Sequence, residues 1–260
     1  MADDGEHLLI QIADGLAEIR LNRPERLNAL SQNMLQSLYQ RVPEVCADPT
    51  VRAILITGAG RAFCAGGDVG PMGPPDPNRT LGGMSAAHYW VKALRFCEKP
   101  VVTAVNGAAA GGGFGIALVG DVVLASDAAF FKAGFTDLGV AADYGLAYTL
   151  PRACGEPRAA EILFSDRRVP AEEAHRLGIV SRLIPAASFE ADAKAFARKL
   201  AGAARGAQLT KRLLRLGEVQ SFTSYLAVEA TTQLEAFQSQ DFLEGVAAFK
   251  AKRPAVFRGL

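Results

Sequence analysis

The sequence has little that would support metal, disulfide or membrane chemistry. Its three histidines are scattered, and none stands in an H-E-x-x-H or comparable metal-ligand spacing. Its four cysteines, at positions 46, 64, 97 and 154, include no C-x-x-C pair. We therefore predict no bound metal, no cofactor and reduced thiols, as expected of a cytoplasmic protein.

Net charge and long apolar runs are also nearly absent. With 28 basic and 27 acidic residues the formal charge is +1, which gives no reason to expect nucleic acid or an anionic membrane as partner. No stretch approaches the ~18 consecutive apolar residues of a membrane span. The acidic start, Met1 to Glu6, predicts no secretory signal. Half of the 260 residues are hydrophobic, enough for one large core.

The most informative stretch of what remains is 105–121, VNGAAAGGGFGIALVGD. It follows an apolar strand at 101–105, and its glycine triplet, 111–113, precedes an apolar run that suits a buried helix. At a helix's first turn, glycines leave backbone N–H groups bare and let a ligand come close. Such donors suit an oxygen carrying negative charge. A tight turn in which small residues merely permit close packing explains the pattern equally well.

Two nucleotide-binding motifs are excluded at this stretch. The glycines do not complete G-x-G-x-x-G, because Ile116 and Leu118 occupy the places of its last glycine. The spacing of Gly107 and Gly112 matches a P-loop, but Gly113 follows where a lysine is needed. The oxygen is therefore not predicted to belong to a nucleotide phosphate.

The first half of the chain gives clear local signals. Strands at 8–12 and 16–21 flank Asp14-Gly15, which predicts a hairpin. Ser31 is a good N-cap for a helix whose last turn Pro43 must disturb. A strand follows at 51–57. The stretch 70–83, with four prolines and four glycines, is predicted to be a mobile loop near the mouth of a site, or a plain surface loop.

The second half changes character towards its end. Helices are predicted at 86–96, from Asp143 to 150, at 158–164 and at 171–177, with strands at 122–125 and 129–131. From 189 onward the pattern is almost wholly helical, with interruptions at 202–206 and 217. We predict repeating strand–strand–helix units over 1–200, which carry the site, and a helical region over 201–260 that packs on the front part or on a neighbouring subunit.

A second glycine turn, 63–68 (FCAGGD), repeats the design of the first. If the two turns approach each other, the N–H groups of Gly67 and Gly112 could point at one carbonyl oxygen. Two such preorganised donors form an oxyanion hole, and losing one typically costs ~3–4 kcal/mol of transition-state stabilisation.

At these turns the sequence resembles the enoyl-CoA hydratase/isomerase (crotonase) superfamily. The resemblance rests on LNRP at 21–24, LNAL at 27–30, FCAGGD at 63–68 and VNGAAAGGG at 105–113, and it extends to LPR at 150–152 and FKAKRP at 249–254. Together these motifs are specific for the superfamily and only weakly specific for the reaction.

The resemblance implies an α/β fold, a spiral of ββα repeats with a C-terminal helical trimerisation region, assembled as a homotrimer or a dimer of trimers. It implies an acyl-CoA thioester substrate from fatty acid metabolism, with coenzyme A as part of the substrate rather than a cofactor. The thioester oxygen would lie between the N–H groups of Gly67 and Gly112. The predicted substrate-binding set is Leu27, Ala29, Ala65, Gly66, Asp68, Phe135 and Leu138.

The departures from the family pattern narrow the chemistry. Hydratases of the family carry two glutamates, where this chain has Gly115 and Phe135. Asp143, in a G-x-x-x-D context, stands where isomerase-like members place a catalytic aspartate. Dehalogenase-like members that act on aromatic acyl-CoA place a nucleophilic aspartate there, with an upstream histidine that His88 roughly matches.

Each candidate also has a structural interpretation. Asp143 could cap the helix that follows it, a role compatible with catalysis. A lone histidine such as His88 is more often a polar residue on a helix face. Asp68 is predicted to cap a helix, Asp137 to sit in a turn and Asp121 to be structural.

A positional isomerase needs one proton carrier, whereas hydration usually needs two groups and a placed water. We therefore expect an enoyl-CoA double-bond isomerase in which Asp143, in an apolar pocket with Phe114, Phe135 and Leu138, acts as acid and base with a raised pKa. The alternatives are a hydratase, a hydrolase or dehalogenase with Asp143 as nucleophile, and a non-catalytic acyl-CoA-binding subunit.

Overall fold

The computed structural model describes residues 6–70 and 76–259. Its strands are β1 (Leu8–Ala13), β2 (Leu16–Leu21), β3 (Ala53–Gly58), β4 (Ala62–Cys64), β5 (Val101–Val105), β6 (Ala108–Ala110), β7 (Val122–Ser126), β8 (Phe130–Lys132), β9 (Arg168–Pro170) and β10 (Arg182–Ile184). Its helices are α1 (Gln32–Ala47), α2 (Pro77–Phe96), α3 (Gly112–Ala117), α4 (Leu146–Cys154), α5 (Glu156–Ser165), α6 (Ala171–Arg176), α7 (Phe189–Ala201), α8 (Arg205–Gly217), α9 (Phe222–Phe237) and α10 (Gln240–Lys250).

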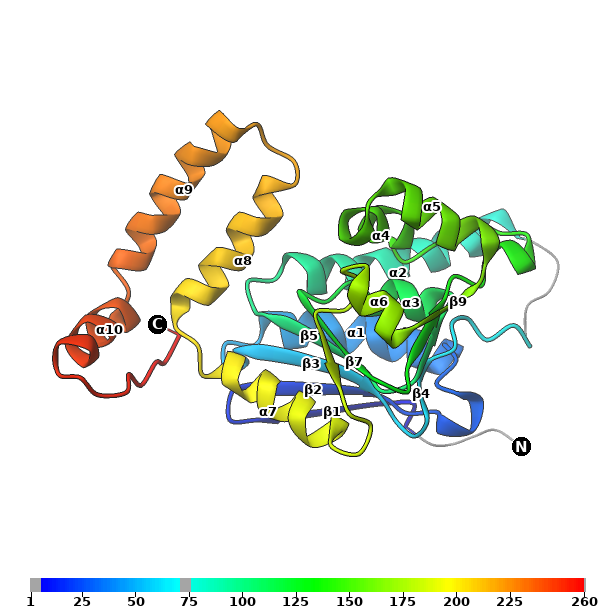
Figure 1. Cartoon of the computed structure of the whole chain (residues 1–260), viewed down its shortest axis with the longest axis horizontal. Coiled ribbons are helices and arrows are strands. Elements are labelled where there is room, and N and C mark those ends of the chain that lie inside the picture. Colours follow the sequence, from blue (N-terminus) through cyan, green and yellow to red (C-terminus); the bar gives the residue numbers. More distant parts are fainter. Residues whose placement is uncertain (1–5, 71–75, 260) are drawn as a thin grey trace.

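The strands of the described chain form two sheets that the chain visits alternately (Figure 1). The larger sheet has the order β1-β2-β3-β5-β7-β10, and the smaller has the order β4-β6-β8-β9. The pairs β3–β5–β7 and β4–β6–β8 are parallel, so each strand–strand–helix unit adds one strand to each sheet. The predicted spiral of ββα repeats is confirmed.

The predicted hairpin opens the larger sheet. β1 and β2 pair antiparallel, with Leu8 opposite Leu21. Asp14 and Gly15 both adopt positive φ, 52° and 77°, as a tight two-residue turn requires. Ser31 caps α1 as expected, because its hydroxyl accepts a hydrogen bond of 3.2 Å from the Met34 N–H.

The central strands of the larger sheet, β3, β5 and β7, are buried on both faces. Along β3, Ile54 and Ile56 point into the main core, which α1, α2 and α3 cover, while Leu55 points to the opposite face. There α7 lays a stripe of small residues, Ala193 and Ala197 among them, against the sheet. Because side chains alternate along a strand, a continuous apolar run such as 53–57 predicts a strand covered on both sides.

The element boundaries differ most from the sequence-based predictions at helices α2 and α4. Helix α2 begins at Pro77, so part of the predicted loop 70–83 is helical, and residues 71–75 lie outside the described chain. The Asp76 carboxylate accepts a hydrogen bond of 3.0 Å from the Asn78 N–H, and Pro77 fits the first helical position because no N–H is needed there. Helix α4 runs through Pro151 to Cys154 instead of ending at 150.

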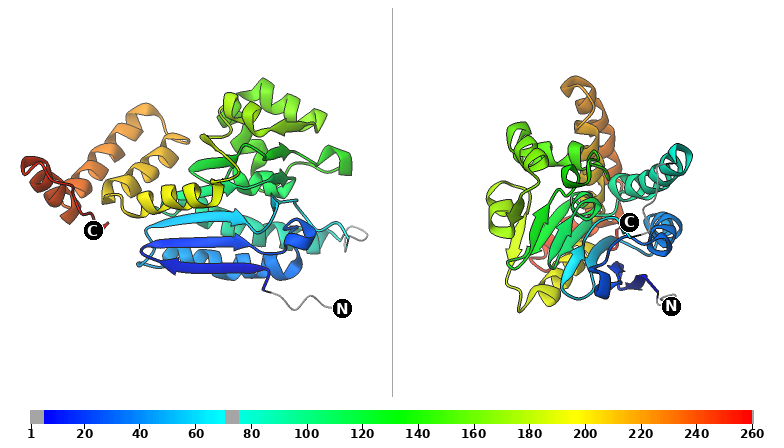
Figure 2. Two further views of the ribbon diagram at one scale, coloured as in Figure 1. Left: turned by 60° about the horizontal axis from the view of Figure 1, so that its bottom comes forward. Right: turned by 90° about the vertical axis from the view of Figure 1, so that its right-hand side faces the viewer.

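The last helices extend away from the sheets (Figures 1 and 2). Buried Lys211 and neighbouring Arg215, both on α8, form ion pairs with Asp121 at 2.9 and 2.5 Å. The Asp121 carboxylate also accepts a hydrogen bond from the Val101 N–H, so it joins β5 to α8 in the structural role predicted for it. No helix among residues 6–70 and 76–259 is long and apolar enough to cross a membrane.

Candidate active site

The two glycine turns meet, as the sequence suggested they could. β4 and β6 pair in parallel, which brings the turns that follow them side by side. A β-carbon at Gly113 would lie 2.2 Å from the Cys64 carbonyl oxygen, and one at Gly66 would lie 2.8 Å from the Ala110 carbonyl oxygen. Only glycine permits this approach, because real β-carbon contacts are not that short.

The backbone donors at the two turns are free of protein acceptors. Gly112 is the first residue of α3, and Gly67 is exposed at the end of the second turn. Within the described residues, neither N–H donates a hydrogen bond to another group of the chain. The first N–H groups of a helix have no intrahelical partner, so the Gly112 donor remains available to a ligand.

Residues 27–30 are joined to the second turn by backbone hydrogen bonds. The Ala65 N–H donates to the Leu27 oxygen at 3.0 Å, and the Leu30 N–H donates to the Gly66 oxygen at 2.8 Å. Leu27, Ala29, Ala65, Gly66 and Gly67 are therefore brought together. The Ala65 N–H is engaged in this contact, so what the segment can offer a ligand at that position is the carbonyl group.

Buried Asn28 fixes the shape of this segment. Its carbonyl oxygen accepts from the Arg23 N–H at 2.8 Å, and its amide donates to the Ala59 and Ala62 oxygens. Leu27 and Asn28 both have positive φ, 52° and 57°, a conformation that non-glycine residues rarely adopt. The side chain of Asn28 thus holds in place a strained backbone that the neighbouring turn needs.

Asp68 does not cap a helix within the described residues, contrary to the prediction. Its carboxylate pairs with Arg23 at 2.6 Å and accepts a hydrogen bond of 3.2 Å from the Gly70 N–H. The hydrogen bond to Arg23, opposed by slight burial, holds the pKa of Asp68 below its usual value. Asp68 therefore ties the second turn to the LNRP segment as a stable anion.

Asp143 lies beside α3 with its carboxylate largely withdrawn from water. One carboxylate oxygen, Oδ1, is buried and has no hydrogen-bond partner among the described residues. Burial raises the pKa of Asp143 to about 6. The alternative role as a helix N-cap is wrong, because α4 begins only at Leu146 and Gly145 is its N-cap. A carboxyl group with one unpaired oxygen and a pKa near neutral pH suits proton transfer.

Tyr144 places Asp143 against the glycine helix. Its backbone has a φ of 49°, and its ring lies 2.7 Å from where a β-carbon of Gly112 would be. A β-carbon at Gly115 would lie 3.1 Å from the Asp143 backbone oxygen. The Tyr144 ring also contacts Trp90 of α2, with centroids 5.8 Å apart. Sequence reasoning missed both aromatic residues, although Trp90 is the chain's single tryptophan.

Other predicted site residues are less closely placed. The Phe135 side chain is buried, but Leu138 is 58% exposed and Phe114 packs in the core against Phe131, with ring centroids 5.0 Å apart. The predicted lining of the Asp143 pocket by Phe114, Phe135 and Leu138 stays a prediction. His88 is exposed on α2. It is Trp90 of the same helix that contacts Tyr144, the residue next to Asp143. Asp137 lies in a short 3₁₀ turn, Thr136–Leu138, and pairs with Lys132.

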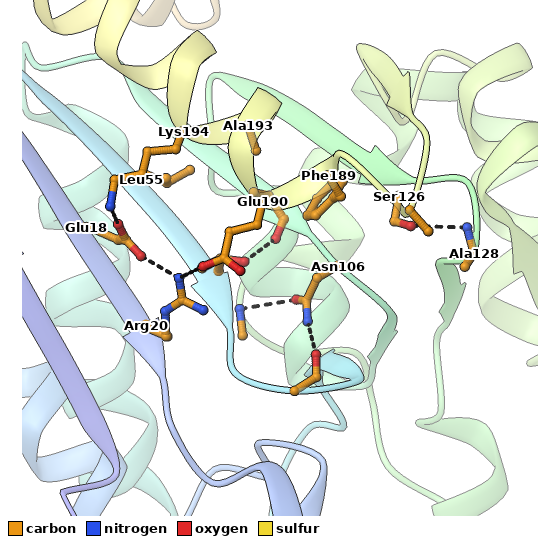
Figure 3. A pocket seen from close by; sticks show the side chains of 15 residues that line it. Glu18, Arg20, Leu55, Asn106, Ser126, Ala128, Phe189, Glu190, Ala193 and Lys194 are labelled. Atoms are coloured by element: carbon orange, nitrogen blue, oxygen red, sulfur yellow. Dashed lines mark hydrogen bonds and ion pairs between the residues drawn. The ribbon is translucent and has the colours of Figure 1, made fainter.

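A different cavity, of about 340 Å³, lies between the larger sheet and α7 (Figure 3). Its charged side chains form a chain of ion pairs in which Glu18 contacts Lys194 and Arg20, and Arg20 also contacts Glu190. Burial raises the pKa of Glu18, but hydrogen bonds from Lys194 and Arg20 outweigh it and keep the pKa low. These charges neutralise one another, unlike the unpaired carboxylate of Asp143.

Residues 11–259 match the family described as Enoyl-CoA hydratase/isomerase. The chain belongs to this family. It is 38% identical to the 1,2-epoxyphenylacetyl-CoA isomerase of Escherichia coli K12, over 98% of this chain and 99% of that protein. It is 32% identical to a 4-chlorobenzoyl coenzyme A dehalogenase of an Arthrobacter species, over 96% of this chain and 93% of that one.

Solved structures of the enoyl-CoA hydratase/isomerase family have the same fold. The enoyl-CoA hydratase of Bacillus anthracis superposes with a TM-score of 0.92 at 28% identity, over 98% of this chain and all of that one. The α/β crotonase fold predicted from the motifs is therefore confirmed over nearly the whole chain. The relatives carry out different reactions by name, so the family alone does not define the reaction of this member.

Proposed function

We propose that this chain is an acyl-CoA isomerase that moves a double bond, with Asp143 as the single acid and base. The observation that carries the proposal is the state of Asp143, whose Oδ1 is buried and unpaired and whose pKa is raised to about 6 by burial. A base poised near the working pH can both accept and return a proton. The isomerase relative at 38% identity supports the same class of reaction.

The two free N–H groups supply the other half of the chemistry. A thioester oxygen bound between Gly67 and Gly112 would gain negative charge as its α-proton leaves, and both donors stabilise that enolate. Close backbone packing around Gly66 and Gly113 constrains the two turns. The donors are therefore already oriented before the reaction, as an oxyanion hole requires.

Substrate binding follows from the same segments. We assign coenzyme A to the surface formed by residues 27–30 and Ala65 to Asp68, where Leu27 and Ala29 border the second turn. The acyl group would extend from the two donors towards Asp143 and Phe135, with Leu138 at its edge. Coenzyme A is thus part of the substrate, and the reaction uses no other cofactor.

The missing glutamates favour isomerisation over hydration. Hydratases that resemble this chain carry carboxylates where it has Gly115 and Phe135, and neither residue can transfer a proton. For hydration, the single carboxylate of Asp143 would have to hold the water molecule, remove its proton and then protonate the α-carbon. Moving a proton between two carbons of one substrate asks less of it.

The second candidate is nucleophilic attack by Asp143 on an aromatic acyl-CoA. It is favoured by the 32% identity to the dehalogenase of the Arthrobacter species. A carboxylate oxygen without a hydrogen-bond partner is a better nucleophile than a paired one, so the free Oδ1 suits this reaction as well. The two candidates differ in whether a covalent ester forms on Asp143.

Isotope exchange separates these candidates. In deuterated solvent, an enoyl-CoA should acquire deuterium at its α- or γ-carbon, and Asp143→Asn should slow this by about 10²–10⁴-fold. Asp137→Asn is the matched control, since that carboxylate is exposed and paired with Lys132, and it should exchange like the wild type. An ester trapped on Asp143 by rapid quench would support the nucleophile instead. Efficient hydration of crotonyl-CoA by the wild type would contradict isomerisation. A wild type without turnover, together with an Asp143→Asn variant of the same acyl-CoA affinity, would indicate a binding subunit.

Two further expectations belong to the proposal. Activity should be unchanged in EDTA, because no step uses a metal ion, and a loss that a divalent ion restores would contradict this. We also propose that the protein is a cytoplasmic homotrimer or a dimer of trimers, assembled through the apolar surfaces of α9 and α10.

A further inference from the structure

Two cysteines meet at the ends of α1 and α2. Cys46 lies in the last turn of α1, and Cys97 directly follows α2. Each thiol is the largest single influence on the pKa of the other, which places the two side chains near each other. Both are only partly buried, and both line a cavity of about 290 Å³ that is separate from the candidate active site. A small solute can therefore reach the pair.

The surroundings of Cys97 favour its thiolate. The Lys211 ammonium lies 3.7 Å from the Cys97 sulfur, and Lys99 adds a second positive charge. The hydrogen bond from Cys46, which outweighs burial, and the charge of Lys211 lower the pKa of Cys97 to about 6, while Asp121 opposes the shift. Glu98 adds little negative charge, because it pairs with Arg205 and Arg212. The positive charge beside its sulfur therefore favours the nucleophilic thiolate form of Cys97.

The other two cysteines provide an internal comparison. Cys64 is fully buried, and burial raises the pKa of its thiol to about 12. Cys154 is partly buried like Cys97, and both sulfurs donate to a backbone oxygen, but burial raises the pKa of Cys154. Neither has a neighbouring thiol among its contacts in the described chain. Of the four cysteines, only Cys46 and Cys97 combine access, proximity and a positive environment.

We propose that Cys46 and Cys97 are a peroxide-reactive pair that closes into a reversible disulfide. The Cys97 thiolate attacks one oxygen of a hydroperoxide, the O–O bond breaks, and hydroxide or alkoxide leaves and takes up a proton. The resulting sulfenic acid is attacked by the Cys46 sulfur, which loses its proton as the second oxygen leaves as water. Two thiols are oxidised to a disulfide, and one hydroperoxide is reduced.

The positions of the two cysteines favour disulfide formation over further oxidation of the Cys97 sulfenic acid. Each cysteine is at a helix end, where the backbone adjusts most easily to the S–S distance of about 2.05 Å that a disulfide needs. The crosslink would fasten the end of α1 to the end of α2. Because a reducing thiol reopens it, the site fits a protein whose cysteines are otherwise free.

The test is peptide mapping of the full-length protein after brief exposure to hydrogen peroxide. Free thiols are then blocked with N-ethylmaleimide, and the protein is digested without reduction and analysed by mass spectrometry. We expect a Cys46–Cys97 crosslink that dithiothreitol removes, with Cys154 still blocked as a thiol. At neutral pH the wild-type Cys97 should also react with iodoacetamide about tenfold faster than Cys154, since its larger thiolate fraction outweighs its lower intrinsic nucleophilicity.

Matched variants assign the roles. Cys46→Ser should leave Cys97 as a sulfenic acid that dimedone traps, Cys97→Ser should abolish both products, and Cys154→Ser should change nothing. The wild-type iodoacetamide rates need no variant, so they test the proposal even if Cys46→Ser fails to fold. The proposal is overturned if peroxide yields no Cys46–Cys97 crosslink, or if Cys154 reacts as fast as Cys97.

Discussion

The β-carbon that any residue but glycine would carry at position 115 lies 2.6 Å from the β-carbon of Tyr144. Position 115 is where family hydratases carry a glutamate, so Tyr144 occupies the space in which that side chain would begin. The absence of a second carboxylate is thus part of how α3 and the 143–145 turn fit together, and a single substitution cannot restore it.

Gly115→Ala should therefore destabilise the protein. Its methyl group would press on the Tyr144 β-carbon and on backbone oxygens of Asp143 and Tyr144, and overpacking of this kind costs about 1–3 kcal/mol. Gly83→Ala is the matched control, because Gly83 is in α2 with open space around it and should gain about 0.4–1 kcal/mol. Urea denaturation measures both, and a neutral Gly115→Ala would refute the contact.

Asp143→Asn should stabilise the protein at neutral pH and not in acid. The pKa of Asp143 is about 6 when folded, against the model-peptide value of 3.8, so ionisation is disfavoured by folding. Above pH 6 the wild type carries this penalty, and below about 3.8 both states are protonated and the penalty is gone. The Tm of the variant should exceed that of the wild type at pH 7.5, with the difference fading by pH 4. Equal Tm values at pH 7.5 would show that Asp143 is not desolvated.

Asp166 should prove important for the segment that leads to Asp143. It is buried with a φ of 53°, and its carboxylate accepts hydrogen bonds from the N–H groups of Gly134 and, at 3.0 Å, Asp137. Asp166→Gly removes both acceptor oxygens, although glycine adopts the positive φ without strain. We expect the free energy of unfolding to fall by about 2 kcal/mol in total. Asp166→Asn keeps one acceptor and should lose less.

Asp14→Gly is the control for Asp166→Gly. Asp14 has nearly the same φ, 52°, in the exposed β1–β2 turn, where glycine is equally suited. Its free energy of unfolding in urea should change by only a few tenths of a kcal/mol. If Asp166→Gly were as mild, the two hydrogen bonds would contribute nothing to the loop.

Assembly should depend on the apolar faces of α9 and α10. Large hydrophobic side chains there stand in water in the single chain, among them Leu234 at 58%, Leu243 at 65% and Phe249 at 86% exposure. Light scattering of the wild type should give the mass of a trimer or hexamer. Leu243→Asp should shift it towards the monomer, whereas Phe164→Ser, an exposed position on α5, should not. A wild-type monomer at micromolar concentration would contradict the proposal.

The sequence by itself determined the elements whose causes are local. Asp14-Gly15 defines a turn, Ser31 a helix start and the 101–105 run a buried strand, and each formed as predicted, because adjacent residues contain the whole signal. The glycine triplet at 111–113 likewise predicted a position where a ligand or another backbone segment comes close. The turn at 63–68 could be suggested as the partner of the triplet only because it has the same pattern of a strand followed by glycines. The parallel pairing of β4 and β6 is what brings the two turns together.

The tertiary structure decided what Asp143 can do. Whether a carboxylate is an N-cap or an unpaired, desolvated acid depends on side chains remote in sequence, and here the start of α4 at Leu146 and the packing of Tyr144 on Gly112, Gly115 and Trp90 decide it. The same holds for Cys46 and Cys97, which are 51 positions apart and meet only because α1 packs on α2. A pKa reflects desolvation and neighbouring charges, which depend on distances in space rather than along the chain.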